Sequence, residues 1–227
     1  MPYEYTKPRL SLAPEEEEKP PIKIGPLTIP IPIACFIWGV AMLAGVFVTI
    51  DYQWLATPNG KTPELWPSNS QITVPVGQPV MLMFLHPHCP CSRSSLAELV
   101  NLMTQVQTRP SIQILFLDSA AFSVPVEQTA AWRTASTIRH ATVHQDQDGR
   151  LSRLFGANSS GTTVLYDKTG RLQFAGGITA GRGHAGTNPG IQALTACLNG
   201  SEVPRRVYPV FGCPISEKPL STESSIQ

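Results

Sequence analysis

The chain has 227 residues, enough for one domain of ordinary size with additional segments. With 17 basic and 16 acidic residues its formal charge is +1, so no broad nucleic-acid-binding surface is indicated. Apolar residues make up 42% of the chain and charged residues 15%, which excludes disorder over its whole length. Five cysteines are too few for a disulfide scaffold, but they are enough for a redox or metal site.

The N-terminal part differs in composition from the rest. Residues 1–29 are rich in proline and contain a run of four glutamates, so we expect a disordered arm there. Residues 31–50 carry no charge, and these twenty residues match the length that a hydrocarbon core of about 30 Å requires. Tyr52 and Trp54 follow, where an interfacial aromatic belt would lie. We predict an uncleaved transmembrane helix over residues 30–52; a buried core helix and a cleaved signal peptide are the alternatives.

The basic residues that flank this helix predict its orientation. Within roughly twenty residues after it only Lys61 is basic, whereas four basic residues precede it: Lys7, Arg9, Lys19 and Lys23. The positive-inside rule therefore puts the N-terminus in the cytoplasm. In a bacterium this predicts a single-pass protein of the inner (cytoplasmic) membrane, with a periplasmic or extracytoplasmic C-terminal domain. Disulfides can form and persist in that compartment.

The remainder of the chain divides into a proline-rich tether over residues 53–69, a domain over 70–214 and a flexible tail over 215–227. The predicted strands of the domain cover residues 72–76, 79–86, 112–118, 141–146, 162–167 and 171–176, the last two forming a hairpin. The predicted helices cover residues 96–106, 126–138, 148–156 and 191–200. Strands that alternate with helices, followed by a hairpin and a last helix, predict an α/β fold with a mixed sheet flanked by helices. This order is compatible with a thioredoxin fold.

The segment FLHPHCPCSRSSLAEL, residues 84–99, carries the clearest chemical signal. A buried strand leads through a turn directly into an amphipathic helix, which places Cys89 at the N-cap and Pro90 at the first helical position. A sulfur at a helix N-terminus meets unpaired N–H groups and the positive end of the helix dipole, which lowers the thiol pKa and favours the nucleophilic thiolate. Three basic side chains could add positive charge nearby: His86, His88 and Arg93.

These residues resemble the thioredoxin-like redoxin family, in which an aromatic residue, a Cys-x-x-Cys pair and a basic residue lead into a helix. Phe84, Cys89 and Arg93 match that pattern. The stretch GTTVLYDKTGRL, which begins with Gly161 and Thr162, is similar to the one that enters the strand beside the family's active site. The segments HPHCPCS, GGIT and RGH look like the bacterial membrane-anchored redoxins called RedB-like. The resemblance runs from residue 72 to about residue 213 and implies a thioredoxin-like fold with no required cofactor.

Two departures from the family pattern bear on the mechanism. Ser92 occupies the place of the second, resolving cysteine, while Cys91 stands one residue earlier; Gly161 stands where the family has a proline. An ordinary Cys-x-x-Cys cycle is therefore not available. Either Cys89 and Cys91 close a small Cys-Pro-Cys ring, which we expect to be strained and comparatively oxidising, or Cys89 pairs with a remote thiol. Cys213 is the candidate for that remote thiol.

The other two cysteines and a glycine-rich loop complete the set of candidates. Cys197 lies on the apolar face of a predicted helix, where a buried, inert cysteine is common, and Cys35 lies in the predicted span. The hairpin should return the chain to the edge of the sheet that carries Cys89, so the loop over residues 177–186 should hang beside the cysteines. Arg182 and His184 are then candidates for lowering the thiolate pKa or holding a substrate; the alternative is an ordinary flexible surface loop.

Three functions remain open on the sequence alone. The first is a membrane-tethered thiol–disulfide oxidoreductase in which Cys89 attacks a substrate disulfide or a peroxide and Cys91 or Cys213 resolves the product. Its partners would be extracytoplasmic protein thiols and disulfides, with a second membrane protein as the source of electrons. The second is copper or zinc binding by His86, His88, Cys89 and Cys91. The third is a module without catalysis that binds a partner. No nucleic-acid partner is expected.

Overall fold

The computed structural model describes most of the chain, namely residues 30–58, 60–73 and 77–215. It divides into two compact units, Met1–Ala44 and Gly45–Gln227. The predicted arm over residues 1–29 lies outside the described residues, and so do residues 216–227 of the predicted tail. Ile215, the first residue of that predicted tail, is buried.

The segment predicted to span a membrane forms one helix, α1 (Ile31–Trp54). Its 24 residues give a helix about 36 Å long, which is longer than the thickness of a hydrocarbon core, roughly 30 Å. None of its residues is buried, although it is apolar around its whole circumference. Within the part of the chain that the structure describes, α1 is the one helix long and apolar enough to cross a membrane, by length and composition.

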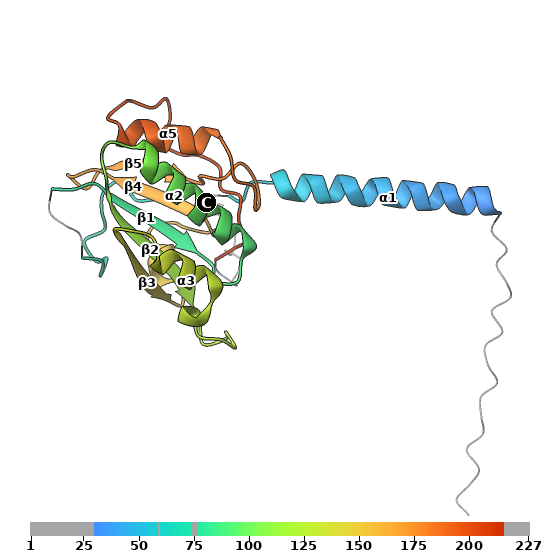
Figure 1. Cartoon of the computed structure of the whole chain (residues 1–227), viewed down its shortest axis with the longest axis horizontal. Helices are drawn as coiled ribbons and strands as arrows, with labels where there is room; N and C mark the ends of the chain where they lie inside the picture. Colours follow the sequence, from blue (N-terminus) through green and yellow to red (C-terminus); the bar gives the residue numbers. More distant parts are fainter. Residues whose placement is uncertain (1–29, 59, 74–76, 216–227) are drawn as a thin grey trace, which may run out of the picture. The chain divides into compact units, whose positions relative to one another are not determined.

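A five-stranded mixed sheet forms the centre of the second unit (Figure 1). The strands are β1 (Val80–Leu85), β2 (Ser111–Asp118), β3 (Ala141–Gln147), β4 (Thr162–Tyr166) and β5 (Leu172–Gly176). Their order across the sheet is β3-β2-β1-β4-β5. The first three are parallel to one another, β4 runs antiparallel to β1, and β5 runs antiparallel to β4.

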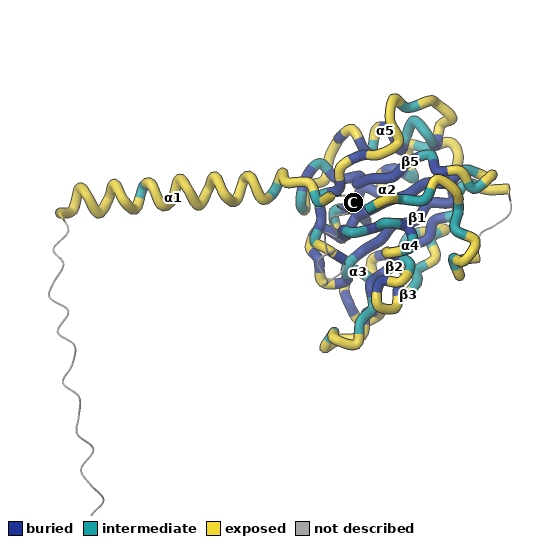
Figure 2. Tube along the Cα trace, turned by 180° about the vertical axis from the view of Figure 1, so that it is seen from behind, coloured by how far each residue is buried: buried dark blue, intermediate teal, exposed yellow. Residues whose placement is uncertain are grey.

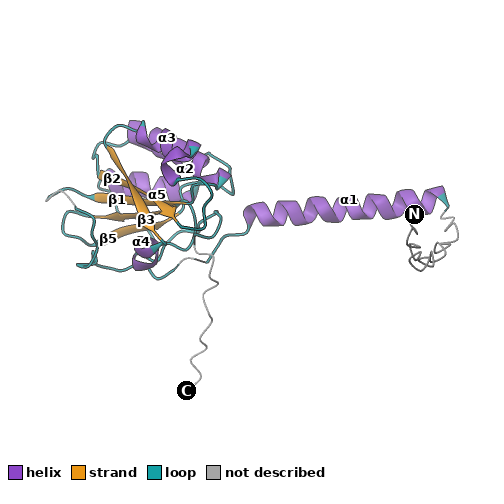
Figure 3. Ribbon diagram, turned by 90° about the horizontal axis from the view of Figure 1, so that it is seen from below, coloured by secondary structure: helices purple, strands orange, loops and turns teal. Residues whose placement is uncertain are grey.

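Helices cover both faces of this sheet (Figure 3). The helices of the domain are α2 (Pro90–Gln105), α3 (Ala130–Ser136), α4 (Arg150–Leu154) and α5 (Pro189–Leu198). Residues of α2, α3 and α5 share one hydrophobic cluster, and residues of α4 pack into the cluster on the opposite face. From residue 79 onward, the order of strands and helices is the predicted one. It is a thioredoxin-like fold, in which a β1-α2-β2 unit and a β4-β5-α5 unit meet at the β1–β4 pair, and this confirms the predicted fold class.

Two predicted elements differ in detail. The predicted helix over residues 126–138 is split into a 3-10 turn, Val126–Gln128, and α3. The split falls at Thr129, whose hydroxyl accepts a hydrogen bond from the Trp132 N–H and so caps the start of α3. In the predicted strand over residues 72–76, the first two residues are not in a strand, and the other three lie outside the described residues.

Every residue of β1 is buried, and Figure 2 draws the central strands in dark blue accordingly. Because successive residues of a strand point to opposite faces, both faces of β1 are buried. Met81, Met83 and Leu85 point into the cluster beneath α2, whereas Leu82 and Phe84 point into the opposite one. Truncation of such a side chain costs about 2–5 kcal/mol, because the surrounding atoms close the cavity only in part. This close packing fixes the carboxyl end of β1, where the chain turns toward the first cysteine.

The predicted tether packs against the domain over much of its length. Leu65 forms an isolated antiparallel bridge with Arg171. The Trp66 ring lies edge-on against Phe155 and Tyr166, at centroid distances of 5.2 and 5.3 Å. This segment therefore contributes apolar contacts to the core on the face that carries α4.

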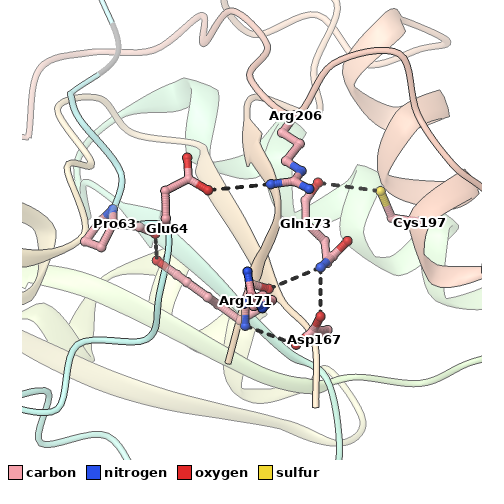
Figure 4. Close-up of polar contacts among 8 residues, drawn as sticks. Pro63, Glu64, Asp167, Arg171, Gln173, Cys197 and Arg206 are labelled. Atoms are coloured by element: carbon pink, nitrogen blue, oxygen red, sulfur yellow. Dashed lines mark hydrogen bonds and ion pairs between the residues drawn. The ribbon is translucent and has the colours of Figure 1, made fainter. Parts of the chain in front are cut away.

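Polar contacts at the β5 edge also involve this segment (Figure 4). The Arg206 guanidinium lies 3.5 Å from the Glu64 carboxylate, an exposed pair worth little in water. Nearby, the Cys197 thiol donates to the carbonyl oxygen of Gln173 at 3.8 Å, and burial raises the pKa of that thiol. Cys197 is thus a half-buried thiol in its protonated form, and its hydrogen bond is to backbone.

Candidate functional site

The first cysteine of the site is held at the junction of β1 and α2. The chain turns after β1, and the Cys89 N–H donates to the His86 carbonyl oxygen at 3.2 Å. Cys89 is the N-cap residue of α2 in an extended conformation, and Pro90 follows at the start of the helix. The Cys89 side chain makes no capping hydrogen bond, so its sulfur remains directed to other partners. Cys89 is 6% exposed.

Three cysteine sulfurs lie together at this point. The Sγ atoms of Cys89, Cys91 and Cys213 are all within 4.8 Å of one another, and those of Cys89 and Cys213 are 2.9 Å apart. All three are free thiols; Cys89 and Cys91 are buried, and Cys213 is half-buried. The structure thus brings together the three cysteines that the sequence singled out as candidates, although their catalytic roles stay predictions.

The segment after α5 carries Cys213 to the site. It first runs beside β5, where the Tyr208 N–H donates to the Ala175 carbonyl oxygen at 2.9 Å. At the cysteine itself, the Ser160 N–H donates to the Cys213 carbonyl oxygen at 2.8 Å. A Cβ atom at Gly212 would lie 1.9 Å from the Ser160 carbonyl oxygen, so only glycine allows this close approach of two backbones.

Hydrogen bonds between the sulfurs set their protonation. The Cys91 thiol donates to the Cys89 sulfur, which lowers the pKa of Cys89 well below its ordinary value; burial opposes this effect, and the Cys213 thiol and N–H reinforce it. The same hydrogen bond raises the pKa of Cys91. Burial, followed by the bond to Cys89, raises the pKa of Cys213. At neutral pH the cluster therefore holds a thiolate at Cys89 and protons on its two neighbours.

The glycine-rich loop lies against Cys91, at the edge of the sheet that the hairpin topology predicted. The Gly183 N–H donates to the Cys91 sulfur. The loop is held to α2 at two points: the Ser94 hydroxyl donates to the Gly183 carbonyl oxygen at 2.8 Å, and the Gly186 N–H donates to the Glu98 carboxylate at 2.7 Å. Backbone of the loop, rather than a charged side chain, is what reaches the cysteine at this point.

Arg182 lies on the Cys213 side of the loop. Its guanidinium donates to the Gly212 carbonyl oxygen, and to the Thr57 hydroxyl at 3.2 Å. The guanidinium carbon also lies 4.7 Å from the centre of the Tyr52 ring. The positive charge of Arg182 partly offsets the effects that raise the pKa of Cys213.

The histidines of the site make other contacts. His184 stacks on Trp54 with a centroid distance of 6.1 Å. The His88 N–H donates to Nδ1 of His86 at 3.2 Å, and both of these imidazole rings lie edge-on to Phe122. Among the residues that the structure describes, no histidine joins the cluster of sulfur atoms. The predicted copper or zinc ligand set of two histidines and two cysteines is therefore not assembled; the third member of the cluster is a cysteine.

Ser92, which stands where the sequence resemblance led us to expect a resolving cysteine, is fully buried and supports the turn before Cys89. Its hydroxyl donates to the His86 carbonyl oxygen at 2.8 Å and lies 2.9 Å from the Ser160 hydroxyl. The Ser160 hydroxyl in turn accepts a hydrogen bond from the His86 N–H at 3.0 Å. A pair of buried hydroxyls, Ser92 and Ser160, thus fixes the backbone of the turn between β1 and α2.

Gly161 joins β4 to the site from the other side. Its N–H donates to the Phe84 carbonyl oxygen at 2.8 Å, and Phe84 pairs with Thr162 in the sheet. Gly161 has φ of +92°, and a Cβ atom there would lie 2.8 Å from the Ser95 hydroxyl oxygen. The positive φ favours glycine, and a larger residue would also press on the end of the Ser95 side chain.

A groove of about 760 Å³ opens beside Cys89. His88 and Arg93 lie on its α2 side, and Val124 and Ala131 line the side toward α3. Cys89 is the one cysteine of the cluster that borders it. The groove therefore offers a substrate an approach to this sulfur, with a basic side chain and apolar surface on its walls.

Comparison with known proteins supports the fold. An uncharacterized conserved protein from Geobacillus kaustophilus has a similar structure, with a TM-score of 0.52, 17% sequence identity, and coverage of 73% of this chain and 94% of its own. A hypothetical protein from Sinorhizobium meliloti gives a TM-score of 0.48 at 18% identity, covering 70% of this chain and 97% of its own. At these identities the first likeness concerns the fold alone, and the second is too weak for an inference.

A secreted Mycobacterium tuberculosis disulfide oxidoreductase homologous to E. coli DsbE gives a TM-score of 0.38 at 17% identity. It covers 55% of this chain and 83% of its own, and this likeness is also too weak for an inference. No protein-family model and no curated protein sequence matches the chain. Any functional conclusion therefore rests on the site itself.

Some residues of the site carried no signal in the sequence. Ser160, Gly212 and Thr57 act through contacts to the backbone of segments that are distant along the chain. The Gly183 N–H could not be anticipated, because every loop residue except proline offers such a donor.

Proposed function

We propose that the chain is a membrane-anchored, extracytoplasmic thiol–disulfide oxidoreductase with Cys89 as its nucleophile. One observation carries this proposal: a helix N-terminus holds the Cys89 sulfur 2.9 Å from the Cys213 sulfur and within 4.8 Å of the Cys91 sulfur. The lowered pKa of Cys89 supports the same assignment, because the thiolate is the attacking species in thiol–disulfide exchange.

The reaction needs two steps on the protein. In the first, the Cys89 thiolate attacks one sulfur of a substrate disulfide; that S–S bond breaks, a mixed disulfide forms, and the departing substrate thiolate takes up a proton. In the second, Cys213 loses its proton and attacks the Cys89 sulfur, which forms a Cys89–Cys213 disulfide and releases the second substrate thiol. The substrate gains two electrons and the protein loses two. A dithiol partner in or at the membrane would restore them.

We assign the resolving step to Cys213 because its sulfur lies 2.9 Å from that of Cys89 and because it is half-buried. Cys91 is adjacent in sequence, and a Cys-Pro-Cys ring would be strained. In this proposal Cys91 acts through its hydrogen bond to Cys89, which keeps the nucleophile deprotonated.

The anchor and the partners follow from the chain outside the site. α1 supports a membrane anchor by its length and composition, and the basic residues before it support an extracytoplasmic domain. Substrates would then be extracytoplasmic protein disulfides or thiols, or a peroxide, and no cofactor is needed. The groove of about 760 Å³ beside Cys89 supports the approach of a protein segment to this sulfur.

Peptide mapping of the full chain in detergent tests the proposal. After air oxidation we expect a Cys89–Cys213 disulfide that a mild dithiol reduces, and the reduced chain should in turn reduce the disulfides of a model protein such as insulin. Cys89→Ser should abolish this activity, and Cys197→Ser should leave it unchanged. Cys213→Ser should accumulate the mixed disulfide. A Cys89–Cys91 disulfide would refute the assignment of Cys213, and free thiols at Cys89, Cys91 and Cys213 after oxidation would refute the proposed function.

A further inference from the structure

The proposed exchange uses two sulfurs at a time, yet three lie together. We propose that the fully reduced protein binds one Cu(I) ion through the thiolates of Cys89, Cys91 and Cys213. This activity goes beyond the proposed oxidoreductase function and uses the same three residues in another state. The argument rests on the donor atoms, their spacing, the groups that face them and the route to them.

The donor set consists of sulfur alone. In the described ranges of the chain, neither an imidazole nor a carboxylate joins the three sulfurs. Soft thiolate ligands select Cu(I), zinc and iron–sulfur clusters, whereas magnesium, calcium and manganese take oxygen ligands. A structural zinc site is almost always tetrahedral with four protein ligands. Three thiolates without a fourth ligand are better matched to Cu(I), which accepts three-coordinate sulfur sites.

The spacing of the sulfurs is close to that of a trigonal site. A metal–sulfur distance near 2.3 Å, as in zinc thiolates, puts the three sulfurs of a trigonal site about 4 Å apart. Here all three lie within 4.8 Å of one another, and the closest pair, Cys89 and Cys213, is 2.9 Å apart. That pair must separate by about 1 Å, and the half-buried Cys213 is the partner with room to move.

The surroundings balance the charge of such a site. Cu(I) binding displaces the protons of Cys91 and Cys213, which leave to solvent. The three thiolates and one Cu(I) then carry a net charge of −2, which needs donors and positive charge nearby. Backbone N–H groups of Cys91 and Cys213 donate to the Cys89 sulfur, and that of Gly183 donates to the Cys91 sulfur. The positive end of α2 lies at Cys89, and the Arg182 guanidinium is bonded to the residue before Cys213. Such surrounding groups hold and tune metal ligands.

An ion can reach the cluster and remain shielded there. Cys89 borders the open groove, and both Cys89 and Cys91 are largely shielded from solvent, at 6% and 5% exposed. Oxidation of any two of the three cysteines removes two ligands at once. Copper binding and the disulfide state are therefore mutually exclusive, and bound Cu(I) should protect the cysteines from oxidation.

The test uses the reduced full chain in detergent without oxygen. Cu(I) is titrated in competition with a chromogenic Cu(I) chelator, and X-ray absorption gives the ligands. We expect one Cu(I) per chain with three sulfur ligands at about 2.3 Å. Cys89→Ser, Cys91→Ser and Cys213→Ser should each lower the affinity at least about 100-fold, beyond the roughly 10–100-fold typical of groups that only orient a ligand. Cys197→Ser and Cys35→Ser are the matched controls and should change it less than twofold.

The outcomes separate this inference from the proposed function. A chain that reduces insulin disulfides but binds no Cu(I), or binds it equally well after Cys213→Ser, would overturn the copper site alone. A chain that binds Cu(I) through three sulfurs but exchanges no disulfides would support the copper site and refute the oxidoreductase. Tighter binding of zinc than of Cu(I) by the same three cysteines would overturn the choice of metal.

Discussion

The guanidinium of Arg182 donates a hydrogen bond to the carbonyl oxygen of Gly212, the residue directly before Cys213. The Arg182 N–H also donates to the Gln53 carbonyl oxygen at 3.2 Å, and its Nε donates to that of Tyr52 at 3.2 Å. One loop residue thus connects the end of α1 with the cysteine that arrives last along the chain. Its side chain lies close enough to Cys213 to affect both its position and its pKa.

Arg182→Ala should raise the pKa of Cys213, because the positive charge that stabilises its thiolate is removed. The alkylation profile of Cys213 against pH, followed by peptide mapping of the reduced chain, should move to higher pH. Arg182→Lys should move it less. Arg182→Ala also removes the hydrogen bonds of this side chain, which should lower the free energy of unfolding. Each kcal/mol lost should lower Tm by about 2–4 °C.

The matched control for this effect is Arg109→Ala. Arg109 lies just before β2, and because β1 and β2 are parallel, this is the end of the strands opposite to the one that carries Cys89. The Cys213 profile should not move in that variant. If both arginine variants shift the profile equally, the effect reflects net charge, and Arg182 has no specific role at Cys213.

Cys91→Ala should make Cys89 less reactive at acidic pH. The Cys91 thiol donates to the Cys89 sulfur and lowers its pKa, so the thiolate persists far below the pH at which an ordinary thiol ionises. Removing that donor raises the pKa, and the alkylation rate of Cys89 at pH 6 should fall about tenfold. Cys91→Ser keeps an O–H donor, so the alkylation rate of Cys89 should fall less in that variant. An unchanged rate in Cys91→Ala would show that backbone N–H groups alone hold the thiolate.

Gly161→Ala should destabilise the domain by about 2–3 kcal/mol, because an L-residue is strained at φ +92° and its Cβ would crowd the Ser95 hydroxyl. Gly200 has φ +77° with open space around it, so Gly200→Ala should cost only about 1 kcal/mol. Urea unfolding gives both values. Adding Ser95→Ala to Gly161→Ala should restore the part due to crowding, and a purely additive double variant would contradict this explanation.

Trp66→Ala should lower the free energy of unfolding by about 3 kcal/mol, because the ring fills space between Phe155 and Tyr166. The neighbouring Leu65 is 59% exposed, so Leu65→Ala should change it by less than about 0.5 kcal/mol. Equal small effects at the two positions would mean that the segment after α1 is a loose connection in solution.

The fold could be predicted from local patterns. The apolar run of β1 and the spacing of Leu96, Leu99 and Met103 in α2 are properties of neighbouring residues, and so is the hairpin turn around Lys168. The packing of Trp66 could not be predicted, because a proline-rich segment has no periodicity that would distinguish a free linker from one that lies on a core.

The site could be predicted only in part. The position of Cys89 follows from a strand that leads into a helix, which is local information. The arrival of Cys213 depends on how the segment after α5 runs beside β5, and no local pattern encodes that path. Cys213 is distant from Cys89 in sequence and joins the cluster, whereas His86 and His88 are close to Cys89 in sequence and do not. The turn directs both imidazole rings toward Phe122.

The separation of Cys89 and Cys213 by 124 residues links the redox state of the proposed pair to the folding of the domain. A bond between them would close a loop over most of the domain, and the chain-entropy model gives about 5 kcal/mol of stabilisation for a loop of that length. A Cys89–Cys91 ring would restrict the unfolded chain hardly at all. Each time the protein reduces a substrate, it would form this disulfide and its free energy of unfolding would rise. When a partner reduces the disulfide again, the domain would return to its lower stability.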